Sequence, residues 1–130
     1  MAEDSQNPFK IAAPEGGGSP VVEDDRAAPA IERVGRMVQS TDGFVFMKGH
    51  PKQPMCGFSA NTVAMLDALG ARYATFDVLS DESVRTAAKE YAQWPTFPQV
   101  WIKGDLVGGD DIVSEMFATG ELAAMMEELQ

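Results

Sequence analysis

The pattern of hydrophobic residues changes at about residue 30. Before this point the few apolar residues follow neither a helical nor a strand period, and prolines, acidic residues and the run Gly16-Gly17-Gly18-Ser19 separate them. Such a segment buries too little apolar surface to offset the entropy lost on ordering. We therefore expect residues 1–29 to form a flexible acidic tail and residues 30–130 to form one folded domain.

Helical periodicity recurs five times after residue 30. In each case apolar residues are spaced three or four positions apart, which places them on one face of a helix. Gly70 is typical of a helix end, and Ser80 or Asp81 is typical of a helix start. The expected helices are 31–38, with Ile31, Val34 and Val38 on its inner face, 58–69, 84–91, one that begins near Asp110, and one that carries Leu122, Met125, Met126 and Leu129.

Strands are predicted between these helices. The continuous apolar run at 44–47 is typical of a strand that is covered on both faces. Residues 49–55 contain two prolines and are expected to form a loop. The other expected strands are 73–76, 100–102 and 105–107, the last two joined as a hairpin through Lys103-Gly104. The order α-β-α-β-α-β-β-α-α predicts an α/β fold, a small mixed sheet with helices on both faces.

Charge and cysteine content narrow the range of functions. The 130 residues include 20 acidic and 10 basic side chains, so the net charge is −10. Such a chain is repelled by nucleic-acid phosphates and by anionic membrane surfaces. No apolar run approaches the roughly 18 residues of a membrane-spanning helix. The chain has one cysteine, so we expect a reducing compartment, the cytoplasm, with a processed organellar protein as the alternative.

That cysteine, Cys56, is the strongest candidate for chemistry. It follows the predicted loop and begins a predicted helix, where unpaired N–H groups and the helix dipole favour the thiolate. Lys48, at the end of the preceding strand, adds a positive charge nearby. The alternative interpretation is that Cys56 is only a small buried hydrophobic residue.

Three motifs favour the chemical interpretation. In Cys56-Gly57-Phe58-Ser59, a serine stands in place of the second cysteine of a C-x-x-C motif. In Trp94-Pro95-Thr96-Phe97-Pro98 the last proline begins a predicted strand, where a cis peptide bond would present backbone groups to an extended peptide. Gly108-Gly109-Asp110-Asp111 turns into a helix N-terminus, an arrangement that binds carboxylates. Trp94 and Trp101 are themselves expected to be packing residues.

Together with Phe46-Met47-Lys48-Gly49, these motifs resemble those of the monothiol, C-G-F-S-type glutaredoxins, which have the thioredoxin fold. The resemblance covers Ala30 to Leu129. It implies a glutaredoxin domain that binds glutathione and a [2Fe-2S] cluster, and that passes the cluster to acceptor proteins. Because the resemblance also implies weak oxidoreductase activity, the alternative function is a glutathione-dependent reductase of protein-glutathione mixed disulfides.

The resemblance assigns roles to individual residues. Cys56 would be the cluster ligand and the catalytic thiol. One group, Lys48 and Arg85 with help from Lys89, would hold the glycine carboxylate of glutathione. Thr96 and Phe97 would pair with the backbone of its cysteine, and the motif at 109–111 would bind its γ-glutamyl end. The residues expected at the glutathione site are Lys48, Gly57, Phe58, Arg85, Lys89, Thr96, Phe97, Pro98, Gly109, Asp110 and Asp111.

The cysteine count also indicates how a cluster would be held. A [2Fe-2S] cluster needs four ligands, usually thiolates, and one chain supplies one. Two chains and two glutathione molecules supply four. We therefore expect a cluster-bridged homodimer when loaded and a monomer when empty. A hydrolytic pair of Cys56 with His50 is disfavoured, because a six-residue loop containing prolines does not fix their geometry.

Asp110 is a departure from the resemblance, because an uncharged residue commonly stands at this position; His50 and Met55 are others. Two interpretations of Asp110 are open. Its carboxylate caps the helix and points to water, or it stands beside the γ-glutamyl carboxylate of glutathione and opposes its binding. The second interpretation predicts that Asp110→Asn tightens glutathione binding.

Overall fold

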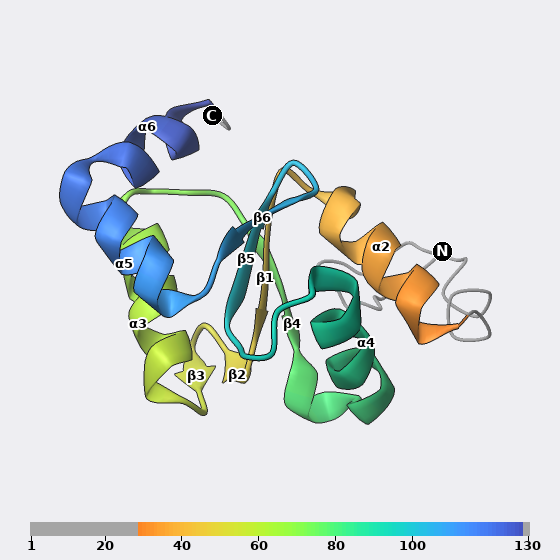
Figure 1. The fold of residues 1–130 in the computed structure, drawn as a ribbon. Coiled ribbons are helices and arrows are strands. Elements are labelled where there is room, and N and C mark those ends of the chain that lie inside the picture. Colours follow the sequence, from red (N-terminus) through yellow and green to blue (C-terminus); the bar gives the residue numbers. More distant parts are fainter. Residues whose placement is uncertain (1–28, 129–130) are drawn as a thin grey trace.

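A four-stranded mixed sheet lies at the centre of the fold (Figure 1). The structure is a computed structural model that describes residues 29–128, so the predicted tail up to residue 28 and Leu129 lie outside the described residues. In the order β4-β1-β5-β6, β1 pairs parallel with β4 and antiparallel with β5, which pairs antiparallel with β6. The strands are β1 (Gly43–Met47), β4 (Ala74–Asp77), β5 (Gln99–Ile102) and β6 (Asp105–Gly108).

Helices cover both faces of this sheet, as the sequence predicted (Figure 1). On one face lie α2 (Ala30–Ser40) and α4 (Glu82–Ala92), which follows the short 3₁₀ helix η1 (Val78–Ser80). On the other face lie α3 (Gly57–Ala68), α5 (Asp110–Thr119) and α6 (Glu121–Glu127). None of the described helices is long and apolar enough to cross a membrane.

Strand β1 separates two hydrophobic cores. Successive side chains of a strand point to opposite faces, and all five residues of β1 are buried. Phe44 and Phe46 pack edge to face, with ring centroids 5.0 Å apart, in the core beneath α2 and α4. Val45 and Met47 pack beneath α3, α5 and α6. The burial of β1 on both faces confirms the predicted strand that is covered on both faces.

Two local expectations are wrong. Residues 49–55 are not an irregular loop throughout, because β2 (Gly49–His50) and β3 (Gln53–Pro54) form a small antiparallel hairpin. Gly49 has a φ of +92°, and a Cβ at this position would lie 2.6 Å from the Gln53 carbonyl oxygen, so the hairpin requires glycine. Ile31 does not share the buried face of α2; it is 38% exposed in the first turn, and Met37 completes the buried stripe with Val34 and Val38.

The N-terminus of α4 is closed by Asp81, one of the two predicted caps. Asp81 Oδ1 accepts hydrogen bonds from the backbone N–H groups of Ser83 (3.0 Å) and Val84 (3.2 Å). Its Oδ2 lies 3.3 Å from Nη1 of Arg33 in α2, so the cap also joins the two helices. Partial burial alone would raise the pKa of Asp81, but the hydrogen bonds from Ser83 and Val84 and the charge of Arg33 hold it below its usual range.

Candidate functional site

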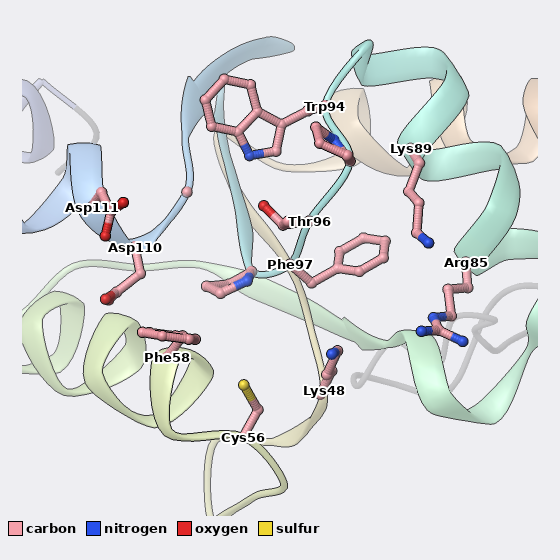
Figure 2. A pocket seen from close by; sticks show the side chains of 13 residues that line it. Lys48, Cys56, Phe58, Arg85, Lys89, Trp94, Thr96, Phe97, Asp110 and Asp111 are labelled. Carbon is pink, nitrogen blue, oxygen red and sulfur yellow. The ribbon is translucent and has the colours of Figure 1, made fainter.

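A cleft of about 440 Å³ opens where β1 ends and where α3 and α5 begin (Figure 2). Four separate stretches of sequence and helix α4 contribute to its walls. Its lining residues are Lys48, Cys56, Phe58, Arg85, Lys89, Trp94, Pro95, Thr96, Phe97, Pro98, Gly109, Asp110 and Asp111. The fold thus brings together all the residues predicted for the site except Gly57. Gly57 is exposed as the first residue of α3 and does not line the cleft.

Cys56 is the residue immediately before α3, and its thiol is partly exposed at the cleft. The thiol makes no full capping hydrogen bond, yet the first-turn N–H groups favour its ionised form. The Ser59 N–H is the main cause that lowers the pKa of Cys56, and the Phe58 N–H and the charge of Lys48 add to it, against a raising effect of partial burial. The sulfur is therefore a better nucleophile and metal ligand at neutral pH than an ordinary thiol.

Ser59, which stands where a second cysteine would be, has a structural role. Its side chain is fully buried, and its hydroxyl oxygen accepts a hydrogen bond from the backbone N–H of Lys48 (3.1 Å). The Ser59 hydroxyl also helps to lower the pKa of Cys56. The Lys48 carbonyl in turn accepts from the Met55 N–H (2.9 Å), which closes the hairpin between β1 and α3. These bonds connect the backbone of Lys48 to the residues on either side of Cys56.

The segment 94–98 lines the cleft, and it contains the predicted cis peptide bond, between Phe97 and Pro98. Gln99, a fully buried polar residue, supports this segment from below. Its Nε2 donates to the carbonyl oxygens of Trp94 (3.3 Å) and Thr96 (3.4 Å), and its Oε1 accepts from Trp101 Nε1 (3.3 Å). The segment is thereby fixed from within, while Thr96 remains exposed to the cleft.

One wall of the cleft is cationic. Lys48 from the end of β1 and Arg85 and Lys89 from α4 lie on the same side (Figure 2). Among the residues that the structure describes, none of the three forms a salt bridge. Within the same part of the chain, Arg85 Nε is buried without a hydrogen-bond partner. A buried unpaired donor is costly, and an anionic ligand group on this wall would satisfy it.

The opposite wall is the N-terminus of α5 and carries two acidic residues. Gly109 precedes the helix and offers no side-chain cap, so the first backbone N–H groups are open to the cleft. Asp110 does not cap the helix and does not simply point to water, so that interpretation is wrong. Its Oδ1 accepts hydrogen bonds from Asn61 Nδ2 and Thr62 Oγ1 of α3, both at 2.9 Å.

Like Pro95, Trp94 lines the cleft without having been predicted for the site. It was expected to be a packing residue, as Trp101 is at 4% exposure, but it forms the upper rim of the cleft (Figure 2). Its Nε1 is buried, has no hydrogen-bond partner among the described residues, and lies 3.2 Å from the place a Cβ of Gly109 would take. Trp94 therefore packs closely against the start of α5, where a side chain larger than that of glycine would displace it slightly. Its place beside Pro95 in the 94–98 motif was the available signal.

His50 lies outside the cleft lining. Its side chain is 69% exposed, and its Nε2 is 3.8 Å from Asp77 Oδ2. Asp77 is itself occupied, because its Oδ1 accepts from the N–H groups of Gly49 and Leu79, both at 2.9 Å. This placement gives no support to a hydrolytic pair with Cys56. Among the described residues, no group of three or more His, Cys, Asp or Glu side chains could hold a metal ion within one chain.

Comparison with known proteins is consistent with this arrangement. The Glutaredoxin family profile matches residues 44–107. The chain is 47% identical over 98 residues to Glutaredoxin 4 of Escherichia coli K12, covering 75% of this chain and 85% of the relative. It is 46% identical over 95 residues to an uncharacterised monothiol glutaredoxin (ycf64-like) of Synechocystis, covering 73% and 89%.

A solved structure adds a liganded example of the same fold. The crystal structure of a buckwheat glutaredoxin-glutathione complex superimposes with a TM-score of 0.69 at 28% sequence identity, covering 85% of this chain and 96% of that chain. The predicted thioredoxin fold is thus confirmed, with its four-stranded mixed sheet between two layers of helices. The bound glutathione belongs to the buckwheat protein.

Proposed function

The chain belongs to the glutaredoxin family, with monothiol glutaredoxins among its relatives, and from this premise we propose that it binds glutathione and carries a [2Fe-2S] cluster. The cluster is the cargo of the protein, held for transfer to acceptor proteins. The observation that carries the proposal is the placement of the chain's one cysteine, Cys56, at a cleft with a cationic and an anionic wall.

The distribution of charge in the cleft supports glutathione as the ligand. Glutathione has a carboxylate at its glycine end, and both a carboxylate and an ammonium at its γ-glutamyl end. The glycine carboxylate would lie against Lys48 and Arg85, where it would satisfy the unpaired Nε of Arg85. The γ-glutamyl carboxylate would meet the open N-terminus of α5, and its ammonium would lie beside Asp111. This orientation directs the glutathione thiol toward Cys56, between the two walls.

The cysteine count supports a shared cluster. One described chain holds no metal-binding group of its own, and a [2Fe-2S] cluster usually takes four thiolates. Two Cys56 thiolates and two glutathione thiolates complete the set. Met55 and Phe58, on either side of Cys56, are 63% and 61% exposed. Two chains that share a cluster would bury these apolar side chains against each other, which favours the dimer.

Anaerobic reconstitution tests the proposal. The full chain is incubated with ferrous iron, sulfide and a reductant, with and without glutathione, and its visible spectrum and elution volume are recorded. We expect charge-transfer absorption and a dimer only with glutathione, and loss of both on removal of the cluster. Arg85→Gln, which keeps Cys56 but removes a cleft cation, should load poorly and recover at high glutathione. A protein that stays colourless and monomeric at every glutathione concentration would contradict the proposal.

The lowered pKa of Cys56 favours a second candidate, a glutathione-dependent oxidoreductase. The Cys56 thiolate would attack the glutathione sulfur of a protein-glutathione disulfide, forming a Cys56-glutathione disulfide and releasing the protein thiolate, which takes up a proton. With no second cysteine in the chain, the thiolate of a second glutathione must then attack the glutathione sulfur of this disulfide, which forms oxidised glutathione and releases the Cys56 thiolate. Rapid turnover of a glutathionylated peptide without a cluster spectrum would favour this candidate over the cluster carrier.

A further inference from the structure

Asp110 is an acidic residue of the cleft whose carboxylate is held by another helix. Its Oδ1 accepts from Thr62 Oγ1 and from Asn61 Nδ2 at 2.9 Å each, and Thr62 is fully buried. The Asn61 amide is fixed in turn by a second bond, to Ser114 Oγ at 3.3 Å. Two donors on one oxygen restrict the rotation of the carboxylate, so Asp110 cannot simply turn away when a ligand enters.

The fixed charge lies at the end of the cleft that already contains Asp111 (Figure 2). The three cations of the site, Lys48, Arg85 and Lys89, lie on the opposite wall. In the described part of the chain, neither Asp110 nor Asp111 forms a salt bridge. The N-terminus of α5 supplies a partial positive charge of about one half. Two carboxylates therefore outweigh it, and this end of the cleft has a net negative charge.

From this geometry we propose that Asp110 is a specificity-determining residue that selects thiol ligands by the charge of their amino end. The inference rests on the proposed glutathione site. One carboxylate, Asp111, is enough to pair with one ligand ammonium. The second, Asp110, adds attraction for a cationic amino end and repulsion for the carboxylate beside it. The cleft is therefore better matched to thiol peptides with an ammonium and no carboxylate at this end than to glutathione itself.

A comparison of two ligands isolates this effect. The probes are glutathione and 4-aminobutanoyl-cysteinylglycine, which keeps the ammonium, the thiol and the glycine carboxylate but lacks the γ-glutamyl carboxylate. Both are titrated calorimetrically into the full chain and into Asp110→Asn, at low and high salt. The Asn side chain keeps an oxygen that accepts from Thr62 and Asn61, so it removes the charge and retains the hydrogen bonds. Ser114→Ala is the matched control, because it disturbs the same hydrogen-bond network without changing charge.

We expect Asp110→Asn to tighten glutathione binding by about fivefold at low salt, the effect of one unfavourable pair of partly exposed charges. Binding of the analogue should stay unchanged or weaken, since it loses an attraction and no repulsion. The gain for glutathione should shrink at high salt, and Ser114→Ala should leave the ratio of the two affinities unchanged.

Three results would overturn the inference. One is an equal change in affinity for both ligands, and another is no change for either. The third is a gain for glutathione that persists at high salt, because a new hydrogen bond from the Asn amide, and not the lost charge, would then explain it. If the unmodified protein binds neither ligand, the glutathione site itself is wrong and this inference falls with it. If it binds glutathione, the outcome concerns Asp110 alone.

Discussion

The N-terminus of α4 differs from those of α3 and α5 in what its first backbone N–H groups face. At α4 the carboxylate of Asp81 accepts from the first-turn N–H groups and pairs with Arg33 of the neighbouring helix. At α3 and α5 no side chain makes a capping hydrogen bond, and both helices begin at the cleft. The capped, or closed, terminus of α4 stabilises the fold. The uncapped, or open, termini of α3 and α5 direct their partial positive charge toward the cleft.

The comparison shows how one physical property serves two purposes. A free helix N-terminus is stabilised by about 1 kcal/mol when a side chain caps it. Leaving α3 and α5 without such caps gives up this stabilisation. In return, the N–H groups of α3 lower the pKa of Cys56, and those of α5 remain available to a ligand carboxylate. The predictions that follow close an open terminus, obstruct one, open the closed one, or remove a charge beside an open one.

Cys56→Ser closes the terminus of α3 and should have the largest effect. Serine is a preferred residue at this position, so the free energy of unfolding should rise by a few tenths to about 1 kcal/mol. Glutathione-dependent cluster loading should be lost completely, because no other cysteine exists in the chain. Urea denaturation and the visible spectrum after reconstitution measure the two effects. A Ser variant that is less stable than the unmodified protein and still shows the cluster absorption would contradict this view of the α3 terminus.

Gly109→Ala should obstruct the terminus of α5. The new Cβ would lie 3.2 Å from Trp94 Nε1 and 3.4 Å from the Pro98 carbonyl oxygen, so the rim or the helix must shift. Crowding of this kind costs about 1 kcal/mol or more, and we expect glutathione affinity to fall by about tenfold, as a 1.4 kcal/mol loss implies. Gly57→Ala is the control, since nothing lies within 4 Å of its added Cβ. An equal loss of glutathione affinity in the two variants would show that the contact with Trp94 does not cause the loss.

Asp81→Ala opens the terminus of α4. The free energy of unfolding should fall by about 1 kcal/mol, while cluster loading and the reactivity of Cys56 stay unchanged, since Asp81 does not line the cleft. Its folded pKa lies below the ordinary value of 3.8, so the stabilisation is present above that value and is lost as pH falls through the folded pKa. Denaturation at pH 7 and at pH 3 should show the variant and the unmodified protein converging in acid.

Lys48→Gln should produce the smallest effect. The charge of Lys48 is a lesser cause of the lowered pKa of Cys56 than the N–H groups of Ser59 and Phe58. The rate of alkylation by iodoacetamide is measured as a function of pH. The midpoint of this profile should therefore move to slightly higher pH and remain below the midpoint of a free thiol. Lys52→Gln, in the exposed hairpin, is the control and should not move the profile. A shift that restores the profile of a free thiol would mean that Lys48, and not the helix terminus, dominates.

The sequence could predict the elements and most of the cleft because both depend on local patterns. The apolar run of β1, the glycine after α3 and the 94–98 motif each determine structure within a few residues. The role of Gln99 could not be predicted, because a buried glutamine is recognised only by the carbonyls it supports. The hydrogen-bond partners of Asp110 could not be predicted for the same reason. These partners, Asn61 and Thr62, are 49 and 48 residues away in the chain and meet Asp110 only when α3 and α5 pack together.

The cationic wall of the cleft gives ligand capture an unusual dependence on ionic strength. Far from the surface, glutathione with its net charge of −1 meets a chain of net charge −10, and this repulsion slows the encounter. Close to the cleft it meets Lys48, Arg85 and Lys89, which slow its departure. Added salt screens both fields, so association and dissociation should both become faster. The residence time of the ligand would then change more with salt than its equilibrium affinity does.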